Sequence, residues 1–165
     1  MSKPAGILVF ALGLWCGAGV AEAAAQEEAR CAPAERFLTQ EFAMVTRVDP
    51  DTLDDWRTRK RLPACRITSA GARSTTIAAA ARVFYERVRA AGWTRTPDPR
   101  DAPNESSLRF RMEETDCLFN VYQGPLLGTE SEIEVTSAVD LRRGDALYHV
   151  LVLCTPAMDA VPRGS

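Results

Sequence analysis

The chain has 165 residues, and its 20 lysines and arginines nearly balance its 22 aspartates and glutamates, so the formal net charge is −2. A charge this close to zero gives no whole-protein field that would draw the chain to nucleic acid or to an anionic membrane surface. We therefore expect no nucleic-acid partner. After Lys3 the only lysine is Lys60, and this arginine bias, with many alanines and prolines, is typical of a GC-rich bacterial genome.

The N-terminal residues have the pattern of a cleaved signal peptide. Lys3 supplies a basic start, an apolar run extends from Ile7 to about Val20, and small residues with A-x-A spacing follow it. An apolar run of about 14 residues is too short to cross a bilayer, which needs roughly 20. We therefore expect residues 1–25 to be removed, with the cut after Ala23 or Ala25. The mature chain is then secreted or periplasmic, with no membrane span.

The rest of the chain is expected to form a single α+β domain over residues 26–160. A chain of about 140 residues buries roughly 68% of its unfolded surface, which is enough for one hydrophobic core. The last five residues, 161–165, read VPRGS and resemble the remnant of a protease site, so they carry no functional argument.

The cysteines predict a disulfide framework. Loss of Cys16 with the signal peptide leaves Cys31, Cys65, Cys117 and Cys154, and an even number in an exported chain indicates two disulfides. The sequence has no C-x-x-C spacing and a single histidine, so we expect neither a metal site nor a cofactor.

The first part of the domain is predicted to begin with a helix. Pro33 stands where the first turn of a helix tolerates proline, and apolar residues follow it at helical spacing over 33–47. Pro50 is expected to end this helix. Residues 51–59 are predicted to form a short second piece of helix, and residues 65–69 a short strand.

The clearest predicted helix covers residues 74–91. Ser74 is a favourable N-cap, and Gly92 fits the position just beyond the end. The apolar stripe of this helix consists of Ile77, Ala81, Phe84, Val88 and Ala91.

The remaining elements are predicted to be strands. Alternating apolar residues indicate strands over 108–113, 117–122, 132–139 and 147–154. The first two are separated by a link of hairpin length, and the last is apolar at nearly every position, as expected of a central strand. The predicted fold is therefore α+β, with one or two helices packed on a four-stranded antiparallel sheet in two layers, stapled by disulfides.

This sheet constrains the disulfide pairing. In a simple meander the second and fourth strands run parallel, so Cys117 at the start of one and Cys154 at the end of the other are about 16 Å apart. A disulfide needs Cα atoms within about 7 Å. Either Cys117 pairs with Cys31 or Cys65, or Cys117 pairs with Cys154 and the strand order is rearranged. The sequence does not choose between these alternatives.

Two groups of titratable residues attract attention as catalytic candidates. Glu113, Glu114 and Asp116 lie in the predicted hairpin link, where we expect solvated turn residues, since such acids seldom gain the burial that raises a pKa. His149 is the only imidazole in the chain. It lies within a predicted apolar strand, and no G-x-S-x-G nucleophile motif accompanies it.

A more promising surface is the sheet face opposite the predicted core. On this face the sequence places arginines, an amide and an aromatic ring beside the acids Glu132 and Glu134, a combination suited to a protein partner or an anionic ligand. The predicted binding residues are Arg109, Arg111, Asn120 and Tyr122. The basic run 57–61 is the other concentration of positive charge, but several aspartates just before it would neutralise part of it.

These observations favour a small, exported, non-catalytic binding or accessory domain of the bacterial envelope or secretome. Its expected partner is another envelope or secreted protein. The alternative is a small periplasmic or secreted hydrolase that uses His149 with a carboxylate. An enzyme requires His149 in a concave pocket within hydrogen-bond reach of an acid and a nucleophile, whereas a binding domain requires an exposed face with apolar anchors.

Overall fold

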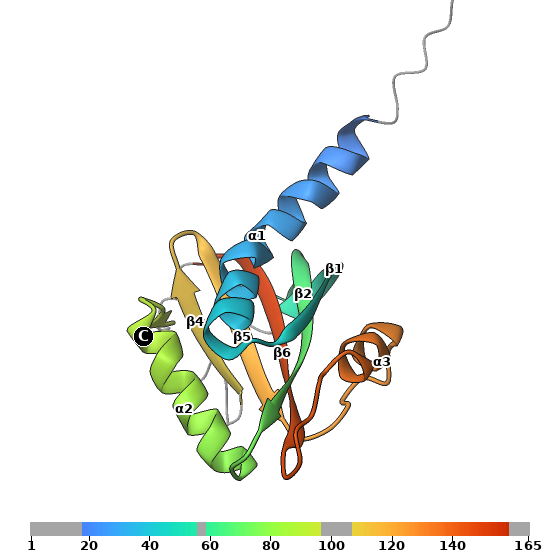
Figure 1. Ribbon diagram of the computed structural model, residues 1–165. Coiled ribbons are helices and arrows are strands. Elements are labelled where there is room, and N and C mark those ends of the chain that lie inside the picture. Colours follow the sequence, from blue (N-terminus) through green and yellow to red (C-terminus); the bar gives the residue numbers. More distant parts are fainter. Residues whose placement is uncertain (1–17, 56–58, 97–106, 159–165) are drawn as a thin grey trace, which may run out of the picture.

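The computed structural model describes residues 18–55, 59–96 and 107–158, with side chains from residue 28 onward. These residues form an α+β fold of three helices and one six-stranded antiparallel sheet, so the number of elements exceeds the prediction. The helices are α1 (Ala18–Phe42), α2 (Ile77–Ala90) and α3 (Glu130–Ser137). The strands are β1 (Val45–Asp55), β2 (Lys60–Arg73), β3 (Thr94–Arg95), β4 (Ser107–Met112), β5 (Thr115–Tyr122) and β6 (Ala146–Pro156). Across the sheet the strand order is β1-β2-β6-β5-β4-β3 (Figure 1).

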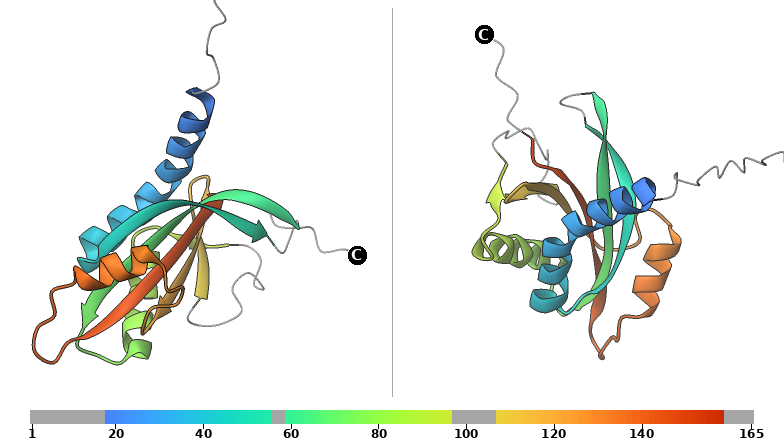
Figure 2. Two further views of the ribbon diagram at one scale, coloured as in Figure 1. Left: turned by 90° about the vertical axis from the view of Figure 1, so that its right-hand side faces the viewer. Right: turned by 90° about the horizontal axis from the view of Figure 1, so that it is seen from above.

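The helices cover both faces of the sheet. α1 and α2 lie over one face, and α3 lies over the opposite face beside β1 and β2 (Figure 2). Where α3 packs, the domain therefore has three layers instead of the predicted two. This difference arises because one predicted strand is a helix, as described below.

The core between the sheet and the first two helices is rich in aromatic rings. Phe84 of α2 contacts Phe37 of α1 and Phe119 of β5, each with 5.8 Å between ring centroids. Phe84, Phe119 and Phe110 of β4 are fully buried. Burial of one such side chain stabilises a fold by roughly 1.5–3 kcal/mol, so these rings are a main source of stability.

The first helix differs from the prediction over 33–47 at both ends. α1 begins at Ala18, holds Pro33 in its interior and ends at Phe42. Ala43 then adopts a left-handed backbone with φ 49°, which turns the chain out of the helix. The N-terminal turns of α1 project away from the sheet (Figure 1). Among the described residues, no helix is long and apolar enough to cross a membrane.

The charged segment after α1 is a strand as far as Asp55, so the helix predicted over 51–59 is wrong for residues 51–55, and residues 56–58 lie outside the described part of the chain. Pro50 lies inside β1 and pairs with Cys65 of β2. β1 is an edge strand, and edge strands tolerate proline because one side of the strand needs no donors. Arg66 of β2 forms ion pairs with Asp51 at 3.1 Å and Asp49 at 3.7 Å. Cross-strand pairing therefore accounts for charges that resemble helix-end signals.

The second strand is much longer than the predicted segment 65–69. β2 starts at Lys60, close to the tip of its hairpin with β1, and Arg61 donates to the hydroxyl of Thr52 at 2.8 Å and pairs with Asp54 at 3.6 Å. The basic run is thus partly neutralised by β1, as expected. Residues 57 and 58 of this run lie outside the described part of the chain.

The helix predicted over 74–91 is confirmed with narrower bounds. The N-cap is Thr76 and not Ser74, because the Thr76 hydroxyl accepts a hydrogen bond from the N–H of Ala79 at 3.3 Å. Gly92 follows the end of α2 with φ 92°, a conformation that favours glycine.

The predicted β-hairpin is confirmed, whereas the predicted strand over 132–139 is wrong. β4 and β5 pair with Met112 opposite Thr115, which leaves a two-residue turn. α3 occupies most of the segment 132–139, and Thr129 forms a capping box with Glu132 at its start. A helix of this length buries only a few side chains, so it shows no clear helical stripe. The apolar alternation in this segment therefore resembled the pattern of a strand.

The helical α3 also resolves the disulfide pairing. With no strand between them, β5 and β6 are antiparallel neighbours, and Cys117 lies directly opposite Cys154 with 4.1 Å between Cα atoms. Cys31 of α1 is bonded to Cys65 of β2 with a Cα separation of 6.0 Å. Two disulfides and a rearranged strand order therefore occur together, as one of the two sequence alternatives required.

Candidate functional site

The predicted binding residues share one side of the β4–β5 hairpin, because the residues between them pack into the core. Most of them are not open to a partner. Arg109 is buried, and Asn120 is half-buried and accepts a hydrogen bond from Ser107. Arg111 and Tyr122 are also half-buried and form hydrogen bonds to carboxylates within the fold. The structure thus brings the predicted residues to one face but uses them largely for internal contacts.

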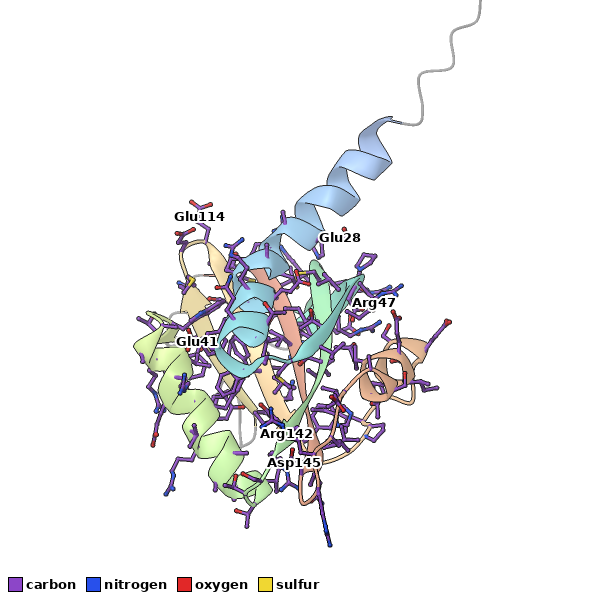
Figure 3. The ribbon with its side chains drawn as sticks, viewed as in Figure 1. Glu28, Glu41, Arg47, Glu114, Arg142 and Asp145 are labelled. Carbon is purple, nitrogen blue, oxygen red and sulfur yellow. A yellow bond between two sulfur atoms is a disulfide. The ribbon has the colours of Figure 1, made fainter. Side chains whose placement is uncertain are left out.

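Asp116 corrects the prediction that all three hairpin acids are solvated. It lies within β5, is fully buried, and accepts two hydrogen bonds from the guanidinium of Arg111 at 2.6 and 2.8 Å. Such a paired, two-point contact is the geometry that makes an arginine–carboxylate pair strong. Glu113 and Glu114 form the turn and are exposed, with Glu114 at the tip of the hairpin (Figure 3).

Glu132 is the second fully buried carboxylate, and it holds the segment that precedes α3. Its oxygens accept hydrogen bonds from the backbone N–H groups of Leu126 at 2.8 Å and Leu127 at 2.9 Å, and from those of Gly128 and Thr129. Burial alone would raise the pKa of Glu132, but these donors and the Tyr122 hydroxyl hold the pKa below its ordinary value. The carboxylate therefore stays charged and fixes the preceding backbone.

The segment held in this way presents apolar side chains to solvent. We call residues 124–129 the leucine loop. Leu126 and Leu127 are 58% and 45% exposed, although the N–H groups of both residues are bonded to Glu132. Ile133, on the first turn of α3, is 68% exposed. Exposed large apolar side chains that cluster in one segment are typical of interaction surfaces.

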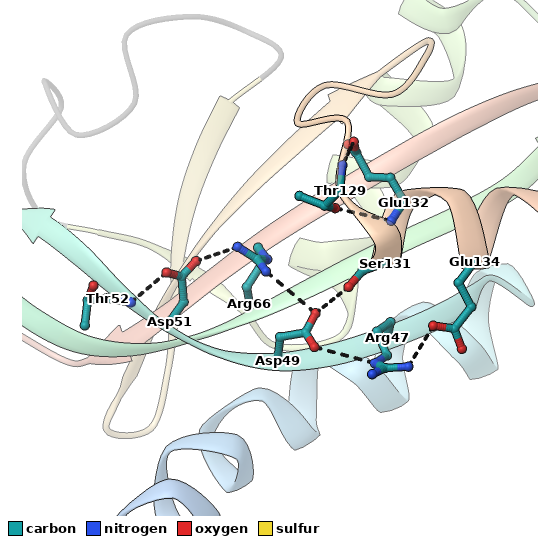
Figure 4. A network of polar contacts seen from close by, with 9 residues as sticks. All are labelled: Arg47, Asp49, Asp51, Thr52, Arg66, Thr129, Ser131, Glu132 and Glu134. Atoms are coloured by element: carbon teal, nitrogen blue, oxygen red, sulfur yellow. Dashed lines mark hydrogen bonds and ion pairs between the residues drawn. The ribbon is translucent and has the colours of Figure 1, made fainter.

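Polar contacts attach α3 to the edge of the sheet. Ser131 donates to the carboxylate of Asp49 at 2.8 Å, and Glu134 pairs with Arg47 at 2.7 Å (Figure 4). The second of these pairs is about half exposed and contributes little, on the order of 0.2–1 kcal/mol. Together with the buried Val135, these contacts hold α3 and the leucine loop in one position.

Beneath α3 lies His149 of β6. Its Nε2 atom is 2.9 Å from the hydroxyl oxygen of Thr136, and its ring stacks on Tyr122 with 5.4 Å between centroids. The side chain is 1% exposed, and Nδ1 has no hydrogen-bond partner among the described residues. Burial lowers the pKa of His149, although the nearby charge of Glu132 opposes this shift. The imidazole is therefore kept neutral inside the fold.

Burial also affects the stacked tyrosine. The pKa of Tyr122 is raised, first by burial and then by its hydrogen bond to the charged carboxylate of Glu132. The hydroxyl donates to that carboxylate at 3.0 Å. Tyr122 thus keeps its proton and acts as the donor in a fixed hydrogen bond that connects β5 to Glu132.

On the other side of the sheet, a groove of about 830 Å³ runs along α2. We call it the α2 groove. Its lining comes from one side of α2 and from the ends of β4 and β5 that meet it. The residues are Ile77, Ala78, Ala81, Arg82, Tyr85, Glu86, Arg89, Leu108, Val121, Tyr122 and Gln123.

Among the described residues, one group of side chains has the close spacing of metal ligands. The sulfur atoms of Cys31, Cys65 and Cys154 lie within 4.8 Å of one another. All three belong to disulfides and so offer no thiolate, the form in which cysteine binds metals.

The sequence contained signals for both surfaces that its interpretation did not use. Leu126-Leu127 stands between Gly124-Pro125 and Gly128, although turn segments are normally polar. Ile77 and Ala81 belong to the predicted core stripe of α2, yet both are only half-buried and line the groove. An apolar pair inside a turn was therefore the clearest available indication of the exposed apolar side chains of the leucine loop.

Comparison of the chain with known proteins finds no matching family model, no matching curated protein and no matching solved structure. Two surfaces thus remain to be explained by their own geometry: the leucine loop with its buried carboxylate, and the α2 groove.

Proposed function

We propose that this protein is an exported, non-catalytic binding domain that attaches to another envelope or secreted protein through the leucine loop. The observation that carries the proposal is the buried Glu132, whose carboxylate accepts hydrogen bonds from four successive backbone N–H groups. These bonds fix the loop while leaving Leu126 and Leu127 exposed. The partner is expected to offer an apolar pocket of two-leucine size.

A fixed loop favours binding because less conformational freedom is lost when the complex forms. Ordering a flexible side chain or loop at an interface costs about 0.5–1.5 kcal/mol per side chain. The backbone of the leucine loop is already ordered in the folded chain, so its ordering does not oppose binding. Apolar anchors presented by an ordered backbone are the groups that dominate the binding energy of protein interfaces.

Export is supported by the chemistry of the chain. The N-terminal residues have the pattern of a signal peptide, and the expected cleavage after Ala23 or Ala25 falls in the part of α1 that projects away from the sheet (Figure 1). Two disulfides are typical of proteins that fold in an oxidising compartment.

The proposal is tested by site-specific photocrosslinking in bacteria that export the full chain. A photoreactive amino acid replaces Leu126 in one variant and Val83 in the other. Val83 lies on α2 and is 44% exposed, so it is a matched apolar position on a different surface. We expect a discrete adduct with one protein from position 126 and none from position 83, with mass spectrometry identifying the partner.

The identified partner then allows a binding measurement. The double change Leu126→Asp with Leu127→Asp is expected to weaken the affinity at least about tenfold, which corresponds to 1.4 kcal/mol, while Val83→Asp leaves it unchanged. Circular dichroism of each variant shows whether the fold persists. Identical adducts from both positions, or full affinity after the double change in a folded chain, would rule out the leucine loop as the binding surface.

One contact favours the alternative of a small hydrolase. The 2.9 Å approach of the Thr136 hydroxyl to Nε2 of His149 has the spacing of a nucleophile and its base. In support of the binding function, His149 is buried, and no carboxylate of the described residues bonds to its Nδ1 atom, where such triads place the group that orients the imidazole. Hydrolysis of ester or peptide substrates that disappears in both Thr136→Val and His149→Gln would establish the enzyme; equal background hydrolysis by all three chains would eliminate it.

A further inference from the structure

The floor of the α2 groove is apolar. Ile77 and Ala81 of α2, Leu108 of β4 and Val121 of β5 contribute to its lining. Ile77, Ala81 and Leu108 pack against the core but are only partly buried, so apolar surface remains that the described residues do not cover. The groove volume of about 830 Å³ falls within the range of roughly 300–1,000 Å³ that small-molecule sites occupy.

The rim of the α2 groove is basic. Arg82 and Arg89 lie two turns apart on α2, about 10 Å along the helix axis, and Glu86 is the one acid in the lining. Within the described residues, Arg82 makes no hydrogen bond or ion pair. At the other end, the guanidinium groups of Arg89 and Arg95 lie 6.0 and 5.5 Å from the ring centroid of Phe110. Positive charge therefore exceeds negative charge along the rim.

We propose that the α2 groove binds an anionic amphiphile, with a hydrocarbon chain on the apolar floor and a carboxylate or phosphate head at the arginines of the rim. Apolar burial supplies about 25 cal/mol for each Å² removed from water. Arginine suits the head group because its planar fork donates two parallel hydrogen bonds to a carboxylate or phosphate. The site uses none of the exposed leucines, so its failure would leave the proposed function untouched, and the reverse also holds.

The binding test is titration calorimetry on the mature chain, with each anionic amphiphile below its critical micelle concentration and dodecanol below its solubility limit. Four ligands separate the parts of the proposal: dodecanoate, dodecyl phosphate, uncharged dodecanol and inorganic phosphate. We expect one molecule of each anionic amphiphile to bind per chain. Dodecanol is expected to bind about tenfold more weakly because it lacks the charge-assisted hydrogen bonds. Inorganic phosphate alone is expected to give no measurable heat.

Variants locate the site. Ala78 is exposed and lines the groove, so Ala78→Trp fills the groove without changing the core and is expected to abolish binding. Ala90→Trp is the matched control, since Ala90 is exposed on the same helix outside the lining. The pair Arg82→Gln with Arg89→Gln is expected to weaken the anions about tenfold and to leave dodecanol unchanged. Arg143→Gln, at an exposed arginine outside the lining, is expected to change neither.

Several results would overturn the proposal. Equal affinity for dodecanol and dodecanoate would remove the role of the arginines. Unchanged binding in Ala78→Trp would place the ligand elsewhere. Absence of binding by both anionic amphiphiles would exclude the ligand class. Binding to anionic lipid vesicles that persists in Ala78→Trp, without binding of single dodecyl ligands, would show a surface that recognises membranes in place of a groove that holds one molecule.

Discussion

The two faces of the same sheet stabilise the molecule in different ways. The face under α1 and α2, which we call the cystine face, buries aromatic rings and both disulfides. Its strand residues include Ile67, Cys65, Cys154, Cys117, Phe119 and Phe110. The opposite face, which we call the polar face, buries charged and polar side chains, which come from the strand positions between those of the cystine face. Its buried residues include Thr68, His149, Thr155, Asp116 and Arg109, with Glu132 of α3 packed over it.

The two faces should therefore respond differently to mutation. Apolar burial is non-directional and scales with the area removed from water, so the cystine face depends mainly on the volume of its side chains. A buried polar group depends on every partner, and loss of one partner leaves another unsatisfied. We therefore expect changes on the cystine face to act through size and changes on the polar face to act through charge and pH.

The largest expected effect is the loss of an aromatic ring that packs on the cystine face. Phe84→Ala removes a fully buried ring and should lower the free energy of unfolding by about 3–5 kcal/mol. The neighbouring change Val83→Ala, at a side chain 44% exposed, should cost no more than about 0.5 kcal/mol. Urea unfolding with intact disulfides measures both. Equal costs would show that the aromatic cluster does not determine stability.

The next largest effect is the loss of the buried carboxylate charge on the polar face. Glu132→Gln should lower the free energy of unfolding at pH 7 by about 2–3 kcal/mol, because an amide cannot replace a carboxylate that accepts from several N–H groups. Since folding lowers the pKa of Glu132, its contribution is present above its ordinary value of 4.5 and is lost as pH falls through the lower folded value. The difference between the two chains should therefore shrink below pH 4.5.

Glu134→Gln is the control for this change. Glu134 lies on the same helix, and its side chain is 56% exposed. Its ion pair with Arg47 should contribute less than about 1 kcal/mol. A Glu132→Gln cost that stays constant from pH 7 to pH 3 would contradict the role of the charged carboxylate.

A smaller effect is the pH dependence of stability that His149 of the polar face introduces. Burial lowers the pKa of His149, so below its ordinary value of 6.5 the unfolded chain takes up a proton that the folded chain refuses. The free energy of unfolding is thus not reduced by His149 above pH 6.5, and it declines below that pH by up to about 1.4 kcal/mol at pH 5.5. His149→Gln should remove this decline, because the chain has no other histidine. Parallel urea midpoints from pH 7.5 to 5.5 for both chains would be the opposite result.

The smallest effect concerns a residue that belongs to neither face. Glu113 in the hairpin turn has φ 53°, a left-handed conformation that costs a residue with a side chain about 1 kcal/mol or slightly more. Glu113→Gly should therefore raise the free energy of unfolding by about 1 kcal/mol at most. Glu114→Gly should not, because Glu114 has no positive φ. Thermal unfolding distinguishes the two changes.

Elements with a long or repeated pattern were predictable from the sequence. The helical periodicity of α2, the alternation of β4 and β5 and the apolar run of β6 each predicted the type of element that the structure shows. α3 was missed because its eight residues mimic alternation, although Thr129 and Glu132 form the spacing of a capping box. β1 was missed because its aspartates resemble helix-end signals, and only the pairing with Arg66 shows their use.

The candidate sites were less predictable, because their properties depend on distant parts of the chain. The sequence does not show that Glu132 is buried, since its burial depends on the return of the preceding loop over the carboxylate. The predicted role of Arg111 assumed a free guanidinium, but Asp116, five residues later, faces it across the hairpin. The α2 groove requires three elements to be placed before it can be recognised.

The pairing of the four cysteines determines how the chain responds to proteolytic cleavage. Each disulfide closes its own ring, one from Cys31 to Cys65 and the other from Cys117 to Cys154, and the rings do not overlap in sequence. A single protease cut inside either ring leaves all fragments covalently joined. A cut between Cys65 and Cys117 instead yields two fragments, each with one closed ring, that only non-covalent contacts such as the β2–β6 ladder hold together. The covalent network thus divides the domain into two halves that only non-covalent contacts unite, those of the sheet and those of α3 with β1.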